Sequence, residues 1–166
     1  MKTVNQKDIA ILCSLHDEWL ESNGKSGERL DLRNKKLENV TLINKDLEES
    51  SFRGCIFKNC RVEDNSFVYA DLSSSIFLGD CRIQGNDFTE AHITNLEGIE
   101  LYSIDNIGTY WGKATFNATE GTVYAGCWQG TLENFLKIGL DNNKGDVIEC
   151  NKIQKAYEFF NSIEEE

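Results

Sequence analysis

The chain has 166 residues, with 17 Lys or Arg and 28 Asp or Glu, which gives a formal net charge of −11. Proteins that bind nucleic acid present a basic face, so this charge argues against direct nucleic-acid binding. No apolar stretch approaches the length of a membrane span, and residues 9–15 are too short for a secretion signal. We therefore expect a cytoplasmic protein without membrane contact, whose six cysteines are reduced.

Residues 1–29 are expected to form a helical cap. Residues 5–22 predict an amphipathic helix that Asn5 caps and that Asn23-Gly24 ends. Its apolar stripe comprises Ile9, Leu12, Leu15 or His16, Trp19 and Leu20. We interpret the stripe as a cover for the segment that follows, with Trp19 in the core and His16 half-buried beside it. A partner helix bound to the stripe is the alternative.

In residues 30–98 an apolar side chain recurs at every fifth position. The series runs through Leu32, Leu37, Leu42, Leu47, Phe52, Phe57, Val62, Phe67, Leu72 and Phe77, and after one extra residue near Gly79 it resumes at Ile83, Phe88 and Ile93. Small residues lie two positions before most of the later centres, namely Ser50, Cys55, Cys60, Ala70, Ser75, Cys81 and Ala91. A period of five fits neither a helix nor a flat strand, so the chain must turn every five residues. These residues predict a solenoid with one large and one small inward side chain in each unit.

Residues 30–94 resemble the pentapeptide-repeat family, whose units read roughly Ala, Asp or Asn, Leu and two variable residues. Residues 70–74, Ala-Asp-Leu-Ser-Ser, are the cleanest copy. The resemblance implies a mainly β fold, a short right-handed quadrilateral parallel β-helix with four units per coil. Lys35 and Lys45 stand where a small residue is expected, which predicts loose packing of the first units. Both ends of so short a column need caps.

Residues 99–166 predict a C-terminal α+β module. The expected strands are 101–104, 107–111, 115–117 and 122–125, with turns at Asp105-Asn106 and Glu120-Gly121. A turn of small residues at 126–131 leads into a helix over 132–140. Asp146 and Glu149 form a capping box for a last helix that ends near Ile163.

This module is similar to one that follows pentapeptide repeats in bacteriophage and prophage proteins. The similarity lies in a Gly-Cys-aromatic-x-Gly-Thr turn and a closing helix with a tyrosine, here Gly126, Cys127, Trp128, Gly130, Thr131 and Tyr157. Many of those proteins have a histidine between the last two helices, and this sequence has none there. The resemblance implies a phage accessory protein.

The sequence shows little that could support catalysis. His16 and His92 lie in the predicted helix and in the repeats, so neither forms a nucleophile–base pair or a metal site. Cys127 is the one arguable nucleophile, because a helix N-terminus could stabilise its thiolate. A small residue in a tight turn is the alternative. We expect a non-enzymatic protein that has neither a metal nor a cofactor.

Aromatic residues gather in the C-terminal module, where glycine turns and backbone N–H groups would suit a planar, anionic ligand. The candidate ligand-binding residues are Tyr110, Trp111, Lys113, Cys127, Trp128, Gln129 and Arg82, with Arg53 and Arg61 as further cations. The alternative is that the aromatic residues only close the end of the β-helix.

Three functions follow from these observations. The first is a phage-encoded binding protein that sequesters a host factor or a small nucleotide-like signal, as an anti-defence protein would. The second is implied by the best-known activity of the pentapeptide-repeat family, a DNA mimic that binds and inhibits a type II topoisomerase. Residues 30–98 carry only eight basic and twelve acidic residues, which fits this role poorly.

The third function is a protein-interaction module that binds a host enzyme through outward side chains such as Tyr69, Arg53 and Lys58. A homo-oligomer is expected in each case, because a short column leaves strand edges unprotected.

Overall fold

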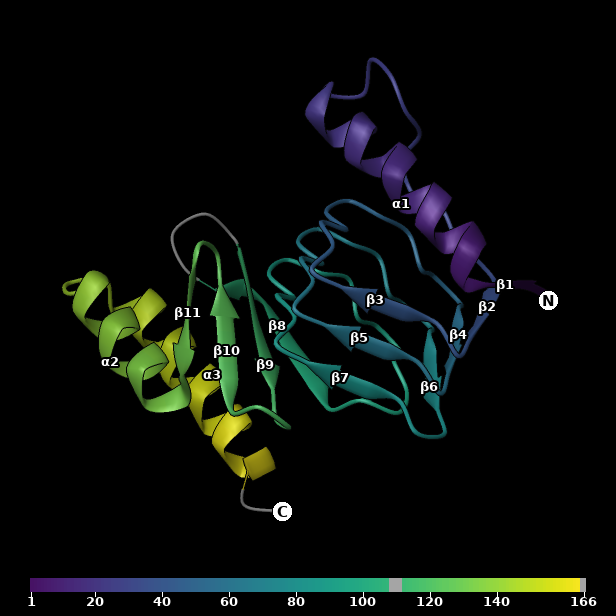
Figure 1. The fold of residues 1–166 in the computed structure, drawn as a ribbon. Helices are drawn as coiled ribbons and strands as arrows, with labels where there is room; N and C mark the ends of the chain where they lie inside the picture. Colours follow the sequence, from purple (N-terminus) through teal and green to yellow (C-terminus); the bar gives the residue numbers. More distant parts are fainter. Residues whose placement is uncertain (108–111, 165–166) are drawn as a thin grey trace. The chain divides into compact units, whose positions relative to one another are not determined.

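The computed structural model describes residues 1–107 and 112–164, which form two compact units, Met1–Ile99 and Glu100–Glu166 (Figure 1). Unit 1 contains one helix and a series of short strands: β1 (Lys2–Val4), α1 (Gln6–Glu21), β2 (Lys35–Glu38), β3 (Thr41–Ile43), β4 (Ile56–Lys58), β5 (Arg61–Glu63), β6 (Ile76–Leu78) and β7 (Arg82–Gln84).

The strands of unit 1 stack in parallel, coil upon coil. One sheet has the order β1-β2-β4-β6 and a second the order β3-β5-β7 (Figure 1). Isolated parallel bridges supply two further columns, Asp31–Ser51–Asp71–His92 and Asp46–Ser66–Asp87. These four columns, visited in turn along the chain, make a parallel β-helix with four strand positions per coil. The five-residue period of the sequence predicted this arrangement.

A left-handed backbone conformation turns the chain at every corner. The last residue of each unit has φ between +52° and +67°, at Asn34, Asn39, Asn44, Glu49, Gly54, Asn59, Asp64, Tyr69, Ser74, Gly79, Gly85, Glu90 and Asn95. Asn and Gly adopt this conformation most readily, which explains their frequency there. At Gly54 the corner is also crowded, since a Cβ would lie 2.5 Å from Asn34 Oδ1 of the preceding coil.

The large side chains at the centres of the units fill the column. Twelve of the thirteen predicted centres are buried, and Ile83 is partly exposed. Phenylalanine rings stack between coils, with centroids 4.4 Å apart for Phe57 and Phe77. Asn65 and Asn86 occupy the small inward position of their units and are both buried. They are hydrogen-bonded to each other, with Asn65 Nδ2 donating to Asn86 Oδ1 at 2.9 Å. A buried polar ladder therefore accompanies the apolar one.

The N-terminal segment is hydrogen-bonded to the first coil. Asn5 Oδ1 caps α1 by accepting from the backbone N–H groups of Lys7 and Asp8. The Gln6 side chain donates to Thr41 O at 3.1 Å and accepts from Thr41 N at 2.7 Å, which occupies the edge of β3. Strand β1, which the sequence did not predict, occupies the edge of β2.

The predicted environments of two α1 residues were wrong. Trp19 is only partly buried, whereas His16 is fully buried. The reason is that His16 is hydrogen-bonded to the first coil: its Nδ1 accepts from Leu30 N at 3.1 Å, and its Nε2 lies 3.1 Å from Glu48 O. Trp19 stacks on the imidazole with centroids 5.7 Å apart.

Unit 2 is an antiparallel sheet packed with two helices. Its elements are β8 (Leu101–Ile107), β9 (Gly112–Asn117), β10 (Thr122–Ala125), β11 (Trp128–Thr131), α2 (Leu132–Asn142) and α3 (Val147–Glu164). The sheet has the order β11-β10-β9-β8. Its core comprises Ala114, Phe116, Val123, Leu132, Phe135, Ile153, Ala156 and Phe160.

Several predicted boundaries in unit 2 need correction. Asp105-Asn106 is not a turn, because β8 continues through it with a bulge and Asn106 takes φ +63°. The turn expected over 126–131 is shorter, since strand β11 begins at Trp128. Asp146 caps α3 as predicted, accepting from Ile148 N and Glu149 N at 3.0 Å. The strand expected at 107–111 falls mostly outside the described residues.

Candidate functional site

Packing within unit 2 accounts for Trp128. Its ring lies 6.3 Å from that of Phe135 and covers Gly130, where a Cβ would come 2.6 Å from the ring. Thr131 Oγ1 accepts from Asn134 N and so caps α2. The turn motif therefore has a structural role: it closes a hairpin, seats an aromatic ring over a glycine and starts a helix.

Cys127 is exposed at the tip of this hairpin, between Ala125 and Trp128, which pair across it. Strand β11 lies between Cys127 and the first residue of α2. Gln129 is exposed on β11. Lys113 lies on β9, mostly buried, with its Nζ 3.9 Å from Asp105 Oδ1. Tyr110 and Trp111 lie outside the described residues.

Arg82 and Arg61 belong to unit 1, where they bind a buried carboxylate. Arg61 Nη2 lies 2.6 Å and Arg82 Nε 2.8 Å from the two oxygens of Glu63, whose side chain is 8% exposed. The hydrogen bond from Arg61 lowers the pKa of Glu63 and keeps it ionised. Both guanidinium groups are thus committed to structure.

A polar groove lies on a different face of the β-helix from the Glu63 ion pairs. We call the surface formed by residues 31–34, 51–54, 71–74 and 92–95 the Arg53 face. On this face, successive coils are in register through the bridges Asp31–Ser51, Ser51–Asp71 and Asp71–His92. The face bears a groove of about 360 Å³, lined by Arg53, Asp71, Ser73, Ser74, His92, Thr94 and Asn95.

Arg53 differs from the other arginine of this face in having no local counterion. Arg33 Nε donates to Asp31 at 2.9 Å, and this hydrogen bond lowers the pKa of Asp31. The equivalent of Asp31 in the next coil is Ser51, so the pairing is not repeated. No carboxylate of residues 1–107 or 112–164 lies within ion-pair distance of Arg53. Its exposed guanidinium is available to an anion.

The rest of the groove offers fixed polar groups. Asp71 Oδ1 accepts from the backbone N–H of Ser73 at 2.9 Å and from its hydroxyl, so this carboxylate is held in place. His92 follows Asp71 in the column and is exposed, as the sequence predicted. Thr94 and Asn95 add a hydroxyl and an amide. The groove thus combines a cation, an imidazole, a carboxylate and neutral hydrogen-bonding groups.

A second polar groove lies beside the first coil, lined by Asp31, Arg33, Asn34 and Lys35, with a volume of about 360 Å³. Its arginine is already paired, which makes it the weaker anion site.

Only part of this site could be predicted from the sequence. Arg53 was among the candidate cations, but its partners come from units one and two coils further on. The available signal was the change from Asp31 to Ser51 two residues before the arginine. This change can be recognised only when the register of the coils is known, because the register shows that Asp31 and Ser51 are equivalent.

Residues 1–107 and 112–164 contain no group of three or more His, Cys, Asp or Glu side chains placed to hold a metal ion. None of the helices in the same ranges has the length and apolar character that crossing a membrane requires.

Comparison with known proteins gave matches only among solved structures: no family model and no curated protein matches the chain. A pentapeptide repeat protein from the thylakoid lumen of Arabidopsis thaliana is 32% identical over 42% of this chain and 47% of its own, with a TM-score of 0.38. HetL is a pentapeptide repeat protein involved in heterocyst differentiation regulation in the cyanobacterium Nostoc. It is 25% identical over 40% of this chain and 31% of its own, with a TM-score of 0.37.

A third pentapeptide repeat protein, Rfr23 from the cyanobacterium Cyanothece, is 17% identical over 45% of this chain and 63% of its own, with a TM-score of 0.27. The matched part of this chain spans less than two thirds of each of these structures. All three are pentapeptide repeat proteins. The evidence for the repeat fold is the strand register of the chain itself.

Proposed function

We propose that this protein is a non-enzymatic binding module that holds a small nucleotide-like ligand in the groove of the Arg53 face. The observation that carries the proposal is the guanidinium of Arg53, which lacks a carboxylate partner among the described residues. A phosphate would supply the missing charge through paired N–H···O bonds. His92 on the same groove adds a second donor to an anion.

The other groups suit the sugar of such a ligand. Asp71 accepts hydrogen bonds, and the hydroxyls of Ser73, Ser74 and Thr94 both donate and accept. The volume of about 360 Å³ lies in the range of small-molecule sites. The site holds a ligand without activating a nucleophile, which fits sequestration rather than turnover. In this proposal the protein is phage-encoded, acts in the host cytoplasm as a homo-oligomer, and carries a phage-type C-terminal module.

Thermal melting against a panel of nucleoside monophosphates and cyclic nucleotides tests the proposal. A ligand at a hundredfold excess over its Kd adds about 2.7 kcal/mol, which raises Tm by several degrees. Arg53→Gln should abolish the shift, and Arg33→Gln, on the same face, should keep it. An unshifted wild-type protein, or a shift that survives Arg53→Gln, would contradict the proposed site.

A second candidate function rests on the charge of another face. The outward positions of residues 46–49, 66–69 and 87–90 carry five acidic residues and no basic one: Asp46, Glu48, Glu49, Asp87 and Glu90. Tyr69 is 56% exposed among them. This face favours docking to a basic protein surface, as on a type II topoisomerase. Inhibition of a purified topoisomerase that is lost on Tyr69→Ala and on Glu49→Lys would support it.

A further inference from the structure

Cys60 and Cys81 occupy equivalent positions in successive coils of the β-helix. Their following residues pair in register, Arg61 with Arg82 and Val62 with Ile83. Arg82 N donates to Cys60 O at 2.9 Å, which fixes the stacking of the two cysteines. Neighbouring strands lie about 4.8 Å apart, and a disulfide needs a Cα separation of roughly 4.4 to 6.8 Å. This general strand spacing falls within the range that a disulfide spans.

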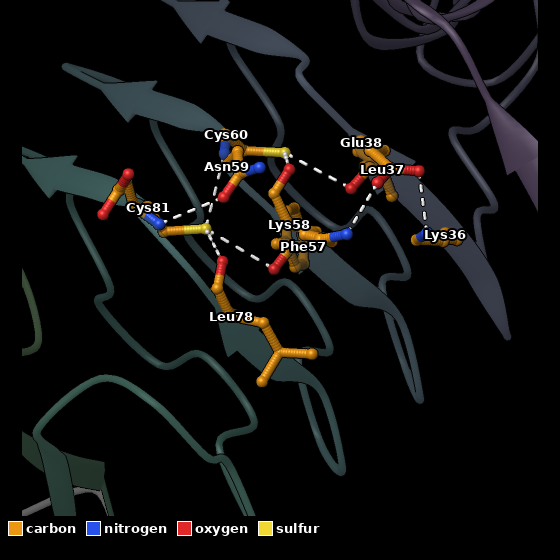
Figure 2. Close-up of polar contacts among 10 residues, drawn as sticks. Lys36, Leu37, Glu38, Phe57, Lys58, Asn59, Cys60, Leu78 and Cys81 are labelled. Atoms are coloured by element: carbon orange, nitrogen blue, oxygen red, sulfur yellow. Dashed lines mark hydrogen bonds and ion pairs between the residues drawn. The ribbon is translucent and has the colours of Figure 1, made fainter.

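The sulfur of Cys81 already lies against Cys60. Cys60 N lies 3.4 Å from Cys81 Sγ, and Figure 2 shows this sulfur between the two coils. The thiol of Cys60 points instead toward the preceding coil, where Leu37 O accepts from it at 3.4 Å. A disulfide would require Cys60 to rotate about its Cα–Cβ bond, so that its sulfur turns from Leu37 O toward the sulfur of Cys81.

The thiols of Cys60 and Cys81 differ in solvent exposure, and the extra residue of the repeat lies just before Cys81. Gly79 and Asp80 form a wider corner before Cys81, held by a hydrogen bond from Asp80 N to Asn59 Oδ1 at 3.1 Å. Cys81 is therefore partly exposed, whereas Cys60 is 2% exposed and Val40, its equivalent one coil earlier, is 1% exposed. Burial also raises the pKa of Cys60, which lowers the fraction of its thiol that is ionised and able to react with an oxidant.

We propose that Cys81 is an oxidation site and that Cys60 is its resolving thiol, so that a peroxide joins them in a disulfide between coils. The Cys81 thiolate attacks a peroxide oxygen, an S–O bond forms, the O–O bond breaks, and hydroxide leaves to become water. The Cys60 thiol then attacks the sulfenic sulfur, the S–S bond forms, the S–O bond breaks, and a second water leaves with the thiol proton. One hydrogen peroxide is reduced for each pair of thiols oxidised.

Trypsin places the three cysteines of this part of the column on separate peptides. Cleavage after Arg53, Lys58, Arg61 and Arg82 gives residues 54–58 with Cys55, 59–61 with Cys60 and 62–82 with Cys81. The full-length protein is treated with hydrogen peroxide, its remaining thiols are alkylated after denaturation, and the digest is analysed by mass spectrometry without reduction. Cys55, fully buried and with a pKa raised by burial to about 11, is the internal control.

We expect peptides 59–61 and 62–82 to be linked, the link to be released by dithiothreitol, and Cys55 to remain alkylated. Cys60→Ser should leave Cys81 as a sulfenic acid that dimedone traps, and Cys81→Ser should leave Cys60 a thiol. The oxidised wild-type protein should melt several degrees higher, because the link closes a loop of about twenty residues. The proposal is overturned if wild-type Cys81 is trapped by dimedone without forming the link, if it stays a thiol, or if the link forms equally well in the denatured chain.

Discussion

Lowering the pH below about 6.5 should destabilise the protein through one buried histidine. His16 uses both ring nitrogens: Nδ1 accepts from Leu30 N, so the proton lies on Nε2, which donates to Glu48 O. A proton on Nδ1 would place its N–H against the backbone N–H of Leu30. The Leu30 N–H would then lose its hydrogen-bond acceptor. Burial accordingly lowers the pKa of His16 below its ordinary value, against the opposing effect of the Glu48 carbonyl and of Asp46 and Asp17.

The sign and size of the effect follow from proton binding. Below about pH 6.5 the unfolded chain binds a proton at this histidine that the folded chain does not, so the free energy of unfolding falls as the pH falls. The stabilisation is complete above pH 6.5 and is lost progressively down to the folded-state pKa. Between pH 7.5 and 5.5 the loss can reach about 1.4 kcal/mol.

Urea unfolding at pH 7.5, 6.5 and 5.5 measures this loss. His16→Gln, which does not titrate, should be less stable than the wild type at pH 7.5 and should lose less stability on acidification. His92→Gln is the matched control, because His92 is exposed and its replacement should leave the profile unchanged. The reasoning is refuted if the wild type is as stable at pH 5.5 as at 7.5, or if His16→Gln keeps the wild-type profile.

Two substitutions test the packing of each unit. Gly54→Ala should cost about 1–2 kcal/mol in the free energy of unfolding, because an L-residue is strained at φ +67° and its Cβ meets Asn34 Oδ1. Asn34→Ala in the same chain should recover part of that loss, and an additive loss would show that the contact does not matter. Trp128→Ala should cost about 2–3 kcal/mol, less than a fully buried tryptophan, and should leave nucleotide binding intact. Loss of binding with unchanged stability would place Trp128 in the site.

The repeat pattern determined more of unit 1 than of unit 2. A five-residue period needs a corner in every unit, and the centres from Leu32 to Phe77 are all buried as predicted. The pattern could not locate β1, because three residues that pair only through their backbone leave no periodic signal. It also could not predict the burial of His16, since the Leu30 and Glu48 groups that bind it are brought together only by the coil.

In unit 2 the sequence predicted the element types better than their ends. Asp105-Asn106 has turn composition, but pairing with β9 carries the strand through it as a bulge. Trp128 is an aromatic residue next to a glycine turn, which suggested a ligand-binding role, but its ring packs near Phe135 of the same unit. The Arg53 groove was harder to predict, because its lining comes from three successive coils and its character depends on a serine in place of an aspartate.

Calorimetric titration of the most stabilising nucleotide into the wild type, Arg53→Gln and Arg33→Gln tests the central claim most directly. Binding by the wild type and Arg33→Gln, with a loss of tenfold or more on Arg53→Gln, is the predicted result; tenfold corresponds to about 1.4 kcal/mol. Equal affinity of all three proteins, or no heat of binding from any nucleotide, would contradict it.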